Sequence, residues 1–325
     1  MAPRILVAGE RPRRSREAIP ITLTLWTEDV SYRMRRLPRH ETLDARGLAH
    51  HVTRWGPPSD DPVVLLHGWA DTADTFQFLV DALEDDWPLV AFDWRGFGRS
   101  QWSRTDYWFP DYFADLDVLL DTLCPAGPAR LVGHSMGGNI ALLYAGIRPE
   151  RVRCVISLEG FGLPRSDVDD TPGRYRKWLQ QLRDPPPFGE FKSFDDLAHL
   201  LLRRNPRLTA ERAAFIARSW AAETESGSVR VTADPAHKLV NPYRYRRDEA
   251  EACWRKIQAP ALLVLAGRSE MLPMLGEEGT YAAFRKAIPG IQIETLETAG
   301  HMLHHEQPEA VAALIEAFLR RGETA

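Results

Sequence analysis

Residues 129–138 read ARLVGHSMGG, and this stretch decides the fold. An apolar run ends in Gly-x-Ser-x-Gly, and a helical pattern follows directly over residues 139–147. This predicts a strand that turns sharply into a helix, with Ser135 at the turn. Such a turn forces the serine backbone toward positive φ, so its neighbours Gly133 and Gly137 must be very small. It also projects the hydroxyl above the helix N-terminus, which favours developing negative charge.

The composition limits the class of protein. A length of 325 residues with 44% apolar content suits one large α/β domain, or a core domain with an insertion. A net charge of −4 gives no reason to expect nucleic acid or an anionic membrane as a partner. The three cysteines are widely spaced, as in reduced cytosolic proteins. No run reaches the ~20 apolar residues of a membrane span, and residues 1–20 lack a signal-peptide core, so the expected location is the cytoplasm.

The first 39 residues differ from the rest. The first 40 hold nine arginines against four acidic residues, and the stretch Arg-Pro-Arg-Arg-Ser-Arg over residues 11–16 shows no helical or aromatic pattern. A basic arm for an acidic partner is one interpretation, but the composition favours a poorly ordered tail.

From residue 40 onward, short apolar runs alternate with helical patterns. Residues 41–44 and 48–55 are predicted to form the two strands of a hairpin. This alternation is typical of an α/β protein with a doubly wound, mostly parallel sheet between helices. Besides those already named, strands are expected at residues 63–66, 88–92, 152–158, 261–266 and 291–296, and helices at residues 75–83, 111–123 and 308–320.

The alternation stops between residues 161 and 258. This segment has no buried-strand run and is rich in aromatic residues and prolines. We interpret it as an inserted helical lid that interrupts a core made of residues 40–160 and 259–325. Helices are expected at residues 174–182, 194–203, 209–223 and 247–256.

Four short motifs occur in a fixed order along the chain. They are His67-Gly68, Asp93-x-Arg95-Gly96-x-Gly98-x-Ser100, Gly133-x-Ser135-x-Gly137, and Gly300-His301 followed by Pro308. In this order and with these intervening elements, residues 40–321 resemble the α/β-hydrolase superfamily. The segments around His67 and Tyr107 are most similar to its lidded bacterial branch, near the serine-hydrolase-like proteins.

The resemblance implies a nucleophile, a base and an acid. A serine nucleophile needs an adjacent base, and Ser135 at its turn can meet one. The simpler interpretation of Ser135 is a helix N-cap. His301 matches the family's base position. For the acid that orients His301 there are two candidates, Glu270 after the post-lid strand and Glu159 directly after the strand over residues 152–158. We favour Glu270, with Glu159 as the rival.

The resemblance also implies supporting groups. The backbone N–H groups of Trp69 and Met136 are the expected oxyanion hole. The side chains of Trp69 and His134 are expected at the substrate pocket, although His134 also suits a turn-packing role. His304 and His305 are expected to be local or solvated.

The expected function is a serine hydrolase that cleaves an ester-like or related acyl bond of a small, largely apolar substrate. Carbon–carbon bond hydrolysis by the same three residue types stays open, as does a non-catalytic small-ligand binder on the same fold. No cofactor or metal is expected, because no His, Cys and carboxylate cluster has ligand spacing. The sequence does not indicate an oligomeric state.

Overall fold

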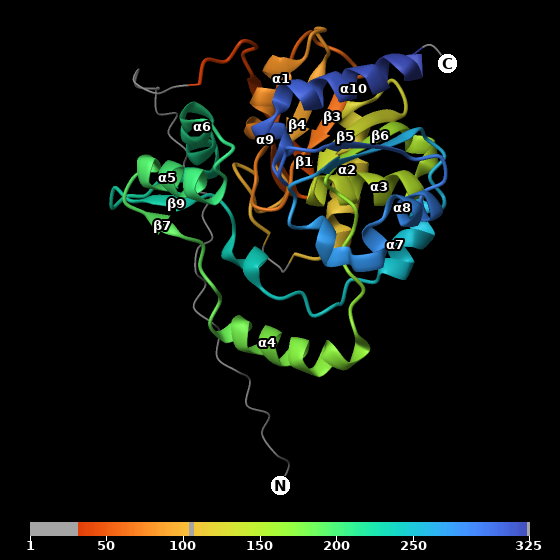
Figure 1. Ribbon diagram of the computed structural model, residues 1–325. Helices are drawn as coiled ribbons and strands as arrows, with labels where there is room; N and C mark the ends of the chain where they lie inside the picture. The colour runs from red at the N-terminus through yellow and green to blue at the C-terminus, as the bar shows by residue number, and fades with distance from the viewer. Residues whose placement is uncertain (1–31, 104–106, 324–325) are drawn as a thin grey trace.

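The computed structural model describes residues 32–103 and 107–323, and an eight-stranded sheet forms its centre (Figure 1). The strand order is β1-β2-β4-β3-β5-β6-β10-β11. The pairs β1–β2 and β2–β4 are antiparallel, and every later neighbour is parallel, which confirms the predicted sheet. The strands are β1 (Arg39–Ala45), β2 (Leu48–Trp55), β3 (Val63–Leu66), β4 (Leu89–Phe92), β5 (Ala129–His134), β6 (Val152–Leu158), β10 (Ala261–Ala266) and β11 (Gln292–Leu296).

Helices cover both faces of this sheet because its central strands are apolar on both sides. In β3, Val64 and Leu66 face one core, and Val63 and Leu65 face the other. A continuous apolar run of this kind is typical of a buried parallel strand. One face carries α2 (Phe109–Leu123), α3 (Met136–Ile147), α7 (Arg247–Trp254) and α8 (Tyr281–Ala287), and the other carries α1 (Gln77–Ala82), α9 (Leu303–Glu306) and α10 (Pro308–Glu323).

Short 3-10 helices join several of these elements. They are η1 (Ala73–Phe76), η2 (Pro149–Arg151), η3 (Val168–Asp170), η4 (Pro235–Lys238) and η5 (Leu272–Gly279). None of the helices in the described part of the chain combines the length and hydropathy that a membrane crossing needs.

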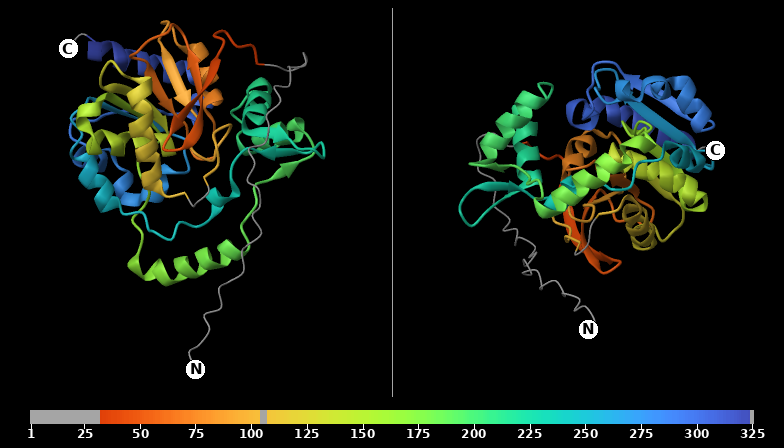
Figure 2. Two further views of the ribbon diagram at one scale, coloured as in Figure 1. Left: turned by 180° about the vertical axis from the view of Figure 1, so that it is seen from behind. Right: turned by 90° about the horizontal axis from the view of Figure 1, so that it is seen from below.

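The inserted segment forms a separate layer beside the sheet, and α4 lies apart from the other helices (Figures 1 and 2). The segment is not purely helical as expected, because three short strands pair there in the order β7-β9-β8. The last residues of the helix expected over 209–223 are instead β8. The elements are α4 (Thr171–Arg183), β7 (Glu190–Phe191), α5 (Phe194–Arg204), α6 (Ala210–Trp220), β8 (Ala221–Glu223) and β9 (Val229–Val231).

The helix α7 belongs by its packing to the core rather than to this layer. Ala250 and Trp254 are buried in the same apolar cluster as α3. A Cβ on Gly146 of α3 would lie 1.9 Å from the backbone oxygen of Cys253, so the two helices are in backbone contact. The expected boundary at residue 258 therefore falls after the chain has already returned to the core.

Residues 32–38 pack against the protein, which differs from the expected tail over residues 1–39. The Tyr32 ring lies 4.8 Å from the Phe78 ring, centroid to centroid. The backbone N–H groups of Arg35 and Arg36 both donate to the Asp81 carboxylate, at 3.1 and 2.8 Å. The remainder of the expected tail, residues 1–31, lies outside the described residues.

Candidate active site

Ser135 sits at the turn between β5 and α3. Its φ of 51° and ψ of −112° match the positive φ expected for the turn. A Cβ on Gly133 would lie 2.4 Å from the Gly137 backbone, and one on Gly137 would lie 2.1 Å from the Leu66 carbonyl oxygen. Only glycine fits both positions. The Ser135 N–H donates to the Leu158 carbonyl at 2.8 Å, which fixes the turn against β6.

His301 reaches Ser135 from the loop after β11. Its Nε2 lies 3.0 Å from the Ser135 Oγ. The Glu306 carboxylate accepts the Gly300 N–H at 2.5 Å and the Asn205 side-chain amide at 2.8 Å, so it anchors the loop that carries His301. Sequence reasoning missed Glu306, which lies only five residues after the histidine.

The carboxylate beside His301 is Glu159. Its Oε2 lies 3.2 Å from His301 Nδ1, and its Oε1 accepts the Ala266 N–H at 2.7 Å. The favoured alternative, Glu270, is exposed to solvent. On this geometry the preference for Glu270 is corrected in favour of its rival. The reason is sheet order, since β6, which ends at Leu158, is the direct neighbour of the serine strand β5.

The hydrogen-bonding roles of the three side chains fit together. The buried Glu159 carboxylate accepts the His301 Nδ1–H, which leaves the Nε2 lone pair for the Ser135 hydroxyl proton. Glu159 itself has a φ of 57°, a second non-glycine residue held in the left-handed region beside the serine. The arrangement has the form of a nucleophile, a base and an orienting acid.

The expected oxyanion donors flank Ser135. Met136 is the first residue of α3, where an N–H has no intrahelical acceptor. A Cβ on Gly68 would lie 3.3 Å from the Ser135 Cβ, so the loop that continues into Trp69 runs beside the serine. Whether the two N–H groups act on an oxyanion stays a prediction.

A cavity of about 140 Å³ is lined by Met136, which directly follows Ser135, and by Trp69. Trp69 lines it as expected, whereas His134 does not. His134 is instead buried, and its Nε2 lies 2.9 Å from the His301 carbonyl oxygen. The lining is rich in aromatic residues and comes from five parts of the chain. It consists of Trp69, Tyr107, Trp108, Phe109, Tyr112, Met136, Trp178, Ala236, His237, Leu239, Val240, Asn241 and Pro242.

His237 forms the wall of this cavity through ring stacking. It lies between Phe97 and Tyr107, with centroids at 3.8 and 3.7 Å. Burial lowers the pKa of His237 to about 3, so it is neutral at physiological pH. His237 belongs to none of the four sequence motifs, and so it could not be singled out from the sequence.

The loop motif around Asp93 and Arg95 makes structural contacts. Asp93 accepts the N–H groups of Ala73 and Arg99, at 2.7 and 2.9 Å. Arg95 binds Asp115 through two buried contacts of 2.5 Å. These bonds hold the loops at the carboxyl ends of β3 and β4.

His304 and His305 are not solvated, which corrects the expectation for them. Both are buried on α9 with at most 1% exposure, and both face Asp71. The histidine rings lie 4.0 Å apart, and the His304 ring lies 4.2 Å from that of His134.

Comparisons with known proteins agree with this fold. A family model described as the alpha/beta hydrolase fold matches residues 61–308. A serine hydrolase-like protein of Danio rerio is 30% identical over 275 residues, which cover 82% of this chain and 83% of the relative. A pimeloyl-[acyl-carrier protein] methyl ester esterase of Neisseria meningitidis is 25% identical and covers 82% of this chain and 95% of its own length. A hypothetical protein of Pseudomonas aeruginosa PAO1 has a solved structure with a TM-score of 0.76 and 25% identity, covering 86% of this chain and 99% of its own.

Proposed function

Because this chain belongs to the α/β-hydrolase fold family, we propose that it is a serine hydrolase that cleaves a small ester through an acyl-enzyme. The observation that carries the proposal is the continuous contact from Ser135 through His301 to Glu159, at 3.0 and 3.2 Å. Such a chain of contacts activates an otherwise weak nucleophile. A protein that only binds a ligand does not need an activated nucleophile.

In the proposed reaction the Ser135 oxygen attacks the ester carbonyl carbon while its proton passes to His301 Nε2. Glu159 stabilises the imidazolium that forms, without taking a proton itself. The N–H groups of Met136 and Trp69 would face the negatively charged oxygen. His301 then protonates the leaving alcohol, and a water molecule activated by His301 releases the acid from Ser135.

The cavity supports a small, largely apolar substrate. Its volume of about 140 Å³ is below the ~300–1,000 Å³ of sites for drug-sized ligands. The name of the Neisseria relative, a methyl ester esterase, favours an ester over a carbon–carbon bond. We therefore expect turnover of p-nitrophenyl esters to be highest for short acyl chains and to fall as the chain lengthens.

The test is a Ser135→Ala variant, with Ser226→Ala at an exposed loop serine as the matched control. The wild type and the control should be labelled by a fluorophosphonate and should turn over the preferred ester. Ser135→Ala should lose labelling and at least ~10³-fold in kcat/KM while keeping its melting temperature. Labelling that persists in Ser135→Ala contradicts the proposed nucleophile. A wild type that is never labelled and hydrolyses no ester contradicts the proposed function.

A further inference from the structure

Three buried side chains outside the serine site converge on one point. Asp71 lies in the loop between β3 and η1, and His304 and His305 lie on α9. Their exposed fractions are 2%, 0% and 1%. The Asp71 Oδ2 lies 3.7 Å from His304 Nε2 and 3.6 Å from His305 Nε2. Although 233 residues separate Asp71 from His304, the fold brings them together.

The atoms that face one another in this cluster have no hydrogen-bond partner among the described residues. They are Asp71 Oδ2, both ring nitrogens of His304, and His305 Nε2. An unsatisfied buried polar atom costs about 1–3 kcal/mol, so several in one place need a physical reason.

The other oxygen of Asp71 is fully used. Asp71 Oδ1 accepts the Thr72 N–H at 2.9 Å, the Thr75 hydroxyl at 2.7 Å and the Trp220 indole N–H at 2.7 Å. These bonds fix the carboxylate in one orientation. The Asp71 Oδ2 therefore faces the two imidazoles at distances longer than a hydrogen bond.

The Asp71 carboxylate has no arginine or lysine partner among the described residues, since its ion-pair contacts are with the two histidines. The guanidinium of Arg212 binds the backbone oxygens of His305 and Glu306 instead of the carboxylate. A buried carboxylate oxygen and imidazole nitrogens that lack hydrogen-bond partners together offer ligands to a cation.

We propose that Asp71, His304 and His305 form a binding site for a divalent transition-metal ion of the zinc class. Separations of 3.6 and 3.7 Å exceed the ~2.7–3.2 Å of a hydrogen bond. They lie close to the ~3.3–3.5 Å edge of a tetrahedron with metal–ligand bonds of ~2.0–2.2 Å. Two imidazole nitrogens and one carboxylate oxygen form a ligand set that zinc accepts, with a fourth position left for water.

The site would join the two loops that serve Ser135. Asp71 follows Trp69 by two residues, and His304 follows His301 by three. The His134 ring lies 4.2 Å from His304 and its Nε2 lies 2.9 Å from the His301 carbonyl. A bound ion would link these two loops through Asp71 and His304, so its role would be to position them. This inference goes beyond the proposed hydrolysis and does not depend on it.

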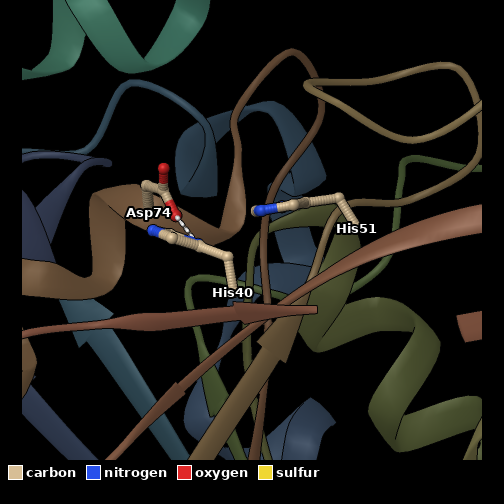
Figure 3. Close-up of side chains that lie close together, drawn as sticks. All are labelled: His40, His51 and Asp74. Carbon is tan, nitrogen blue, oxygen red and sulfur yellow. Dashed lines mark ion pairs between the residues drawn. The ribbon is translucent and has the colours of Figure 1, made fainter. Parts of the chain in front are cut away.

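A second cluster of the same residue types provides a matched control. His40, His51 and Asp74 come from β1, β2 and η1, and Figure 3 shows their side chains gathered beside the sheet. Here a cation is already present, because Arg99 pairs with the Asp74 Oδ2 and lies 3.0 Å from His51 Nε2. The guanidinium already contacts one nitrogen of His51 and one oxygen of Asp74, and this cluster should not retain a metal ion.

The experiment compares the wild type with Asp71→Asn, His305→Gln and the control Asp74→Asn. Asparagine at position 71 can keep all three bonds to Oδ1 while removing the charge and the free ligand oxygen. Each protein is stripped with a chelator, dialysed against Zn²⁺ and analysed for bound metal, and Co²⁺ is titrated as a spectroscopic probe of nitrogen ligation. Melting temperatures are recorded with and without Zn²⁺.

The wild type and Asp74→Asn should each retain one equivalent of Zn²⁺ and show a Co²⁺ visible band. Asp71→Asn and His305→Gln should bind at least ~10-fold more weakly. Zinc at 100 times its Kd should raise the wild-type melting temperature by about 5 °C and leave Asp71→Asn unchanged. Zinc that is absent from the wild type, or retained equally by Asp71→Asn, overturns the proposal and indicates an internal water or a protonated histidine instead.

Discussion

At the scale of single residues, the Glu159 carboxylate makes two contacts at once, one with each of its oxygens. Its Oε2 faces His301 and its Oε1 accepts the Ala266 N–H, so it ties β6, β10 and the histidine loop together. Glutamine at this position keeps the acceptor for Ala266. It can, however, turn an N–H toward His301 Nδ1 and so favour the wrong tautomer.

We therefore predict that Glu159→Gln lowers kcat about 10³- to 10⁴-fold with little change in melting temperature, by analogy with the loss of an orienting acid in serine proteases. The measurement is steady-state turnover of the preferred short-chain ester. The matched control is Glu270→Gln, whose exposed side chain should leave kcat within about 2-fold of wild type. If Glu270→Gln were the more damaged of the two, Glu159 would not be the orienting acid.

The glycines at the serine turn permit a second prediction at this scale. A Cβ on Gly137 would lie 2.1 Å from the Leu66 carbonyl oxygen and 2.6 Å from its carbon, both backbone atoms that cannot move aside. Gly137→Ala should therefore lower the free energy of unfolding by about 3 kcal/mol or more. Gly173 is the control, since its Cβ would meet nothing within 4 Å and it lies in α4. Gly173→Ala should be neutral or stabilising by up to ~1 kcal/mol in urea denaturation, and equal losses in both variants would contradict the steric argument.

Sequence reasoning singled out Ser135 and His301, which the structure brings together, but it favoured Glu270 over Glu159 as the acid, and there is a physical reason for this. The serine is fixed by its flanking glycines and the histidine by a short motif, both of which are local patterns. Glu159 and Glu270 each follow a strand, and only the order of strands decides which one lies beside His301. Strand order results from long-range pairing, which a local pattern does not contain. The same limit explains why His304 and His305 were expected to be local or solvated and not to face Asp71.

At the scale of elements, the segment before β1 connects the two layers. The Tyr32 ring contacts Phe78 of α1 and Phe215 of α6, at 4.8 and 5.7 Å between centroids. Arg36 also donates to the Leu83 carbonyl at 3.1 Å. These contacts bury apolar and polar groups that the core would otherwise expose.

A chain that begins at residue 32 should keep its full melting temperature, whereas one that begins at residue 37 should melt several degrees lower. The second chain loses the Tyr32 ring contacts and both bonds to Asp81, which together stabilise the fold by about 2 kcal/mol. Calorimetry on the two truncations measures the difference. Equal melting temperatures would show that residues 32–36 are dispensable.

The inserted layer shows where element prediction reaches its limit. Its helices were expected from their spacing, and α4, α5 and α6 begin within three residues of the expected positions. The small sheet was missed, because β7 has two residues and β8 and β9 have three each. Strands this short show no alternation of apolar and polar residues. Their pairing is determined by the contacts around them.

At the scale of the whole molecule, buried histidines make the fold sensitive to acid. Burial lowers the pKa of His67, His134, His237 and His305, the last two to about 3. In the unfolded chain each would bind a proton near pH ~6.5. Between the lowered pKa of the native state and the pKa of the unfolded state, the unfolded state binds more protons than the native state. The free energy of unfolding therefore rises with pH and is lost as pH falls. The lowered pKa of Asp93 acts in the same direction, at still lower pH.

We predict that the free energy of unfolding falls steadily from pH 7 to pH 4, by up to about 1.4 kcal/mol per pH unit for each such histidine. Urea denaturation at several pH values measures this slope. His237→Gln tests its origin, because glutamine does not titrate and can still donate to the Arg95 carbonyl that His237 Nε2 contacts at 3.1 Å. Between pH 6 and pH 4, the free energy of unfolding of the variant should fall less steeply than that of the wild type, by up to about 1.4 kcal/mol per pH unit. This difference in slope is expected even if the variant is less stable at every pH. A slope that is unchanged in His237→Gln would mean that this ring takes up a proton in the native state, despite its place between Phe97 and Tyr107.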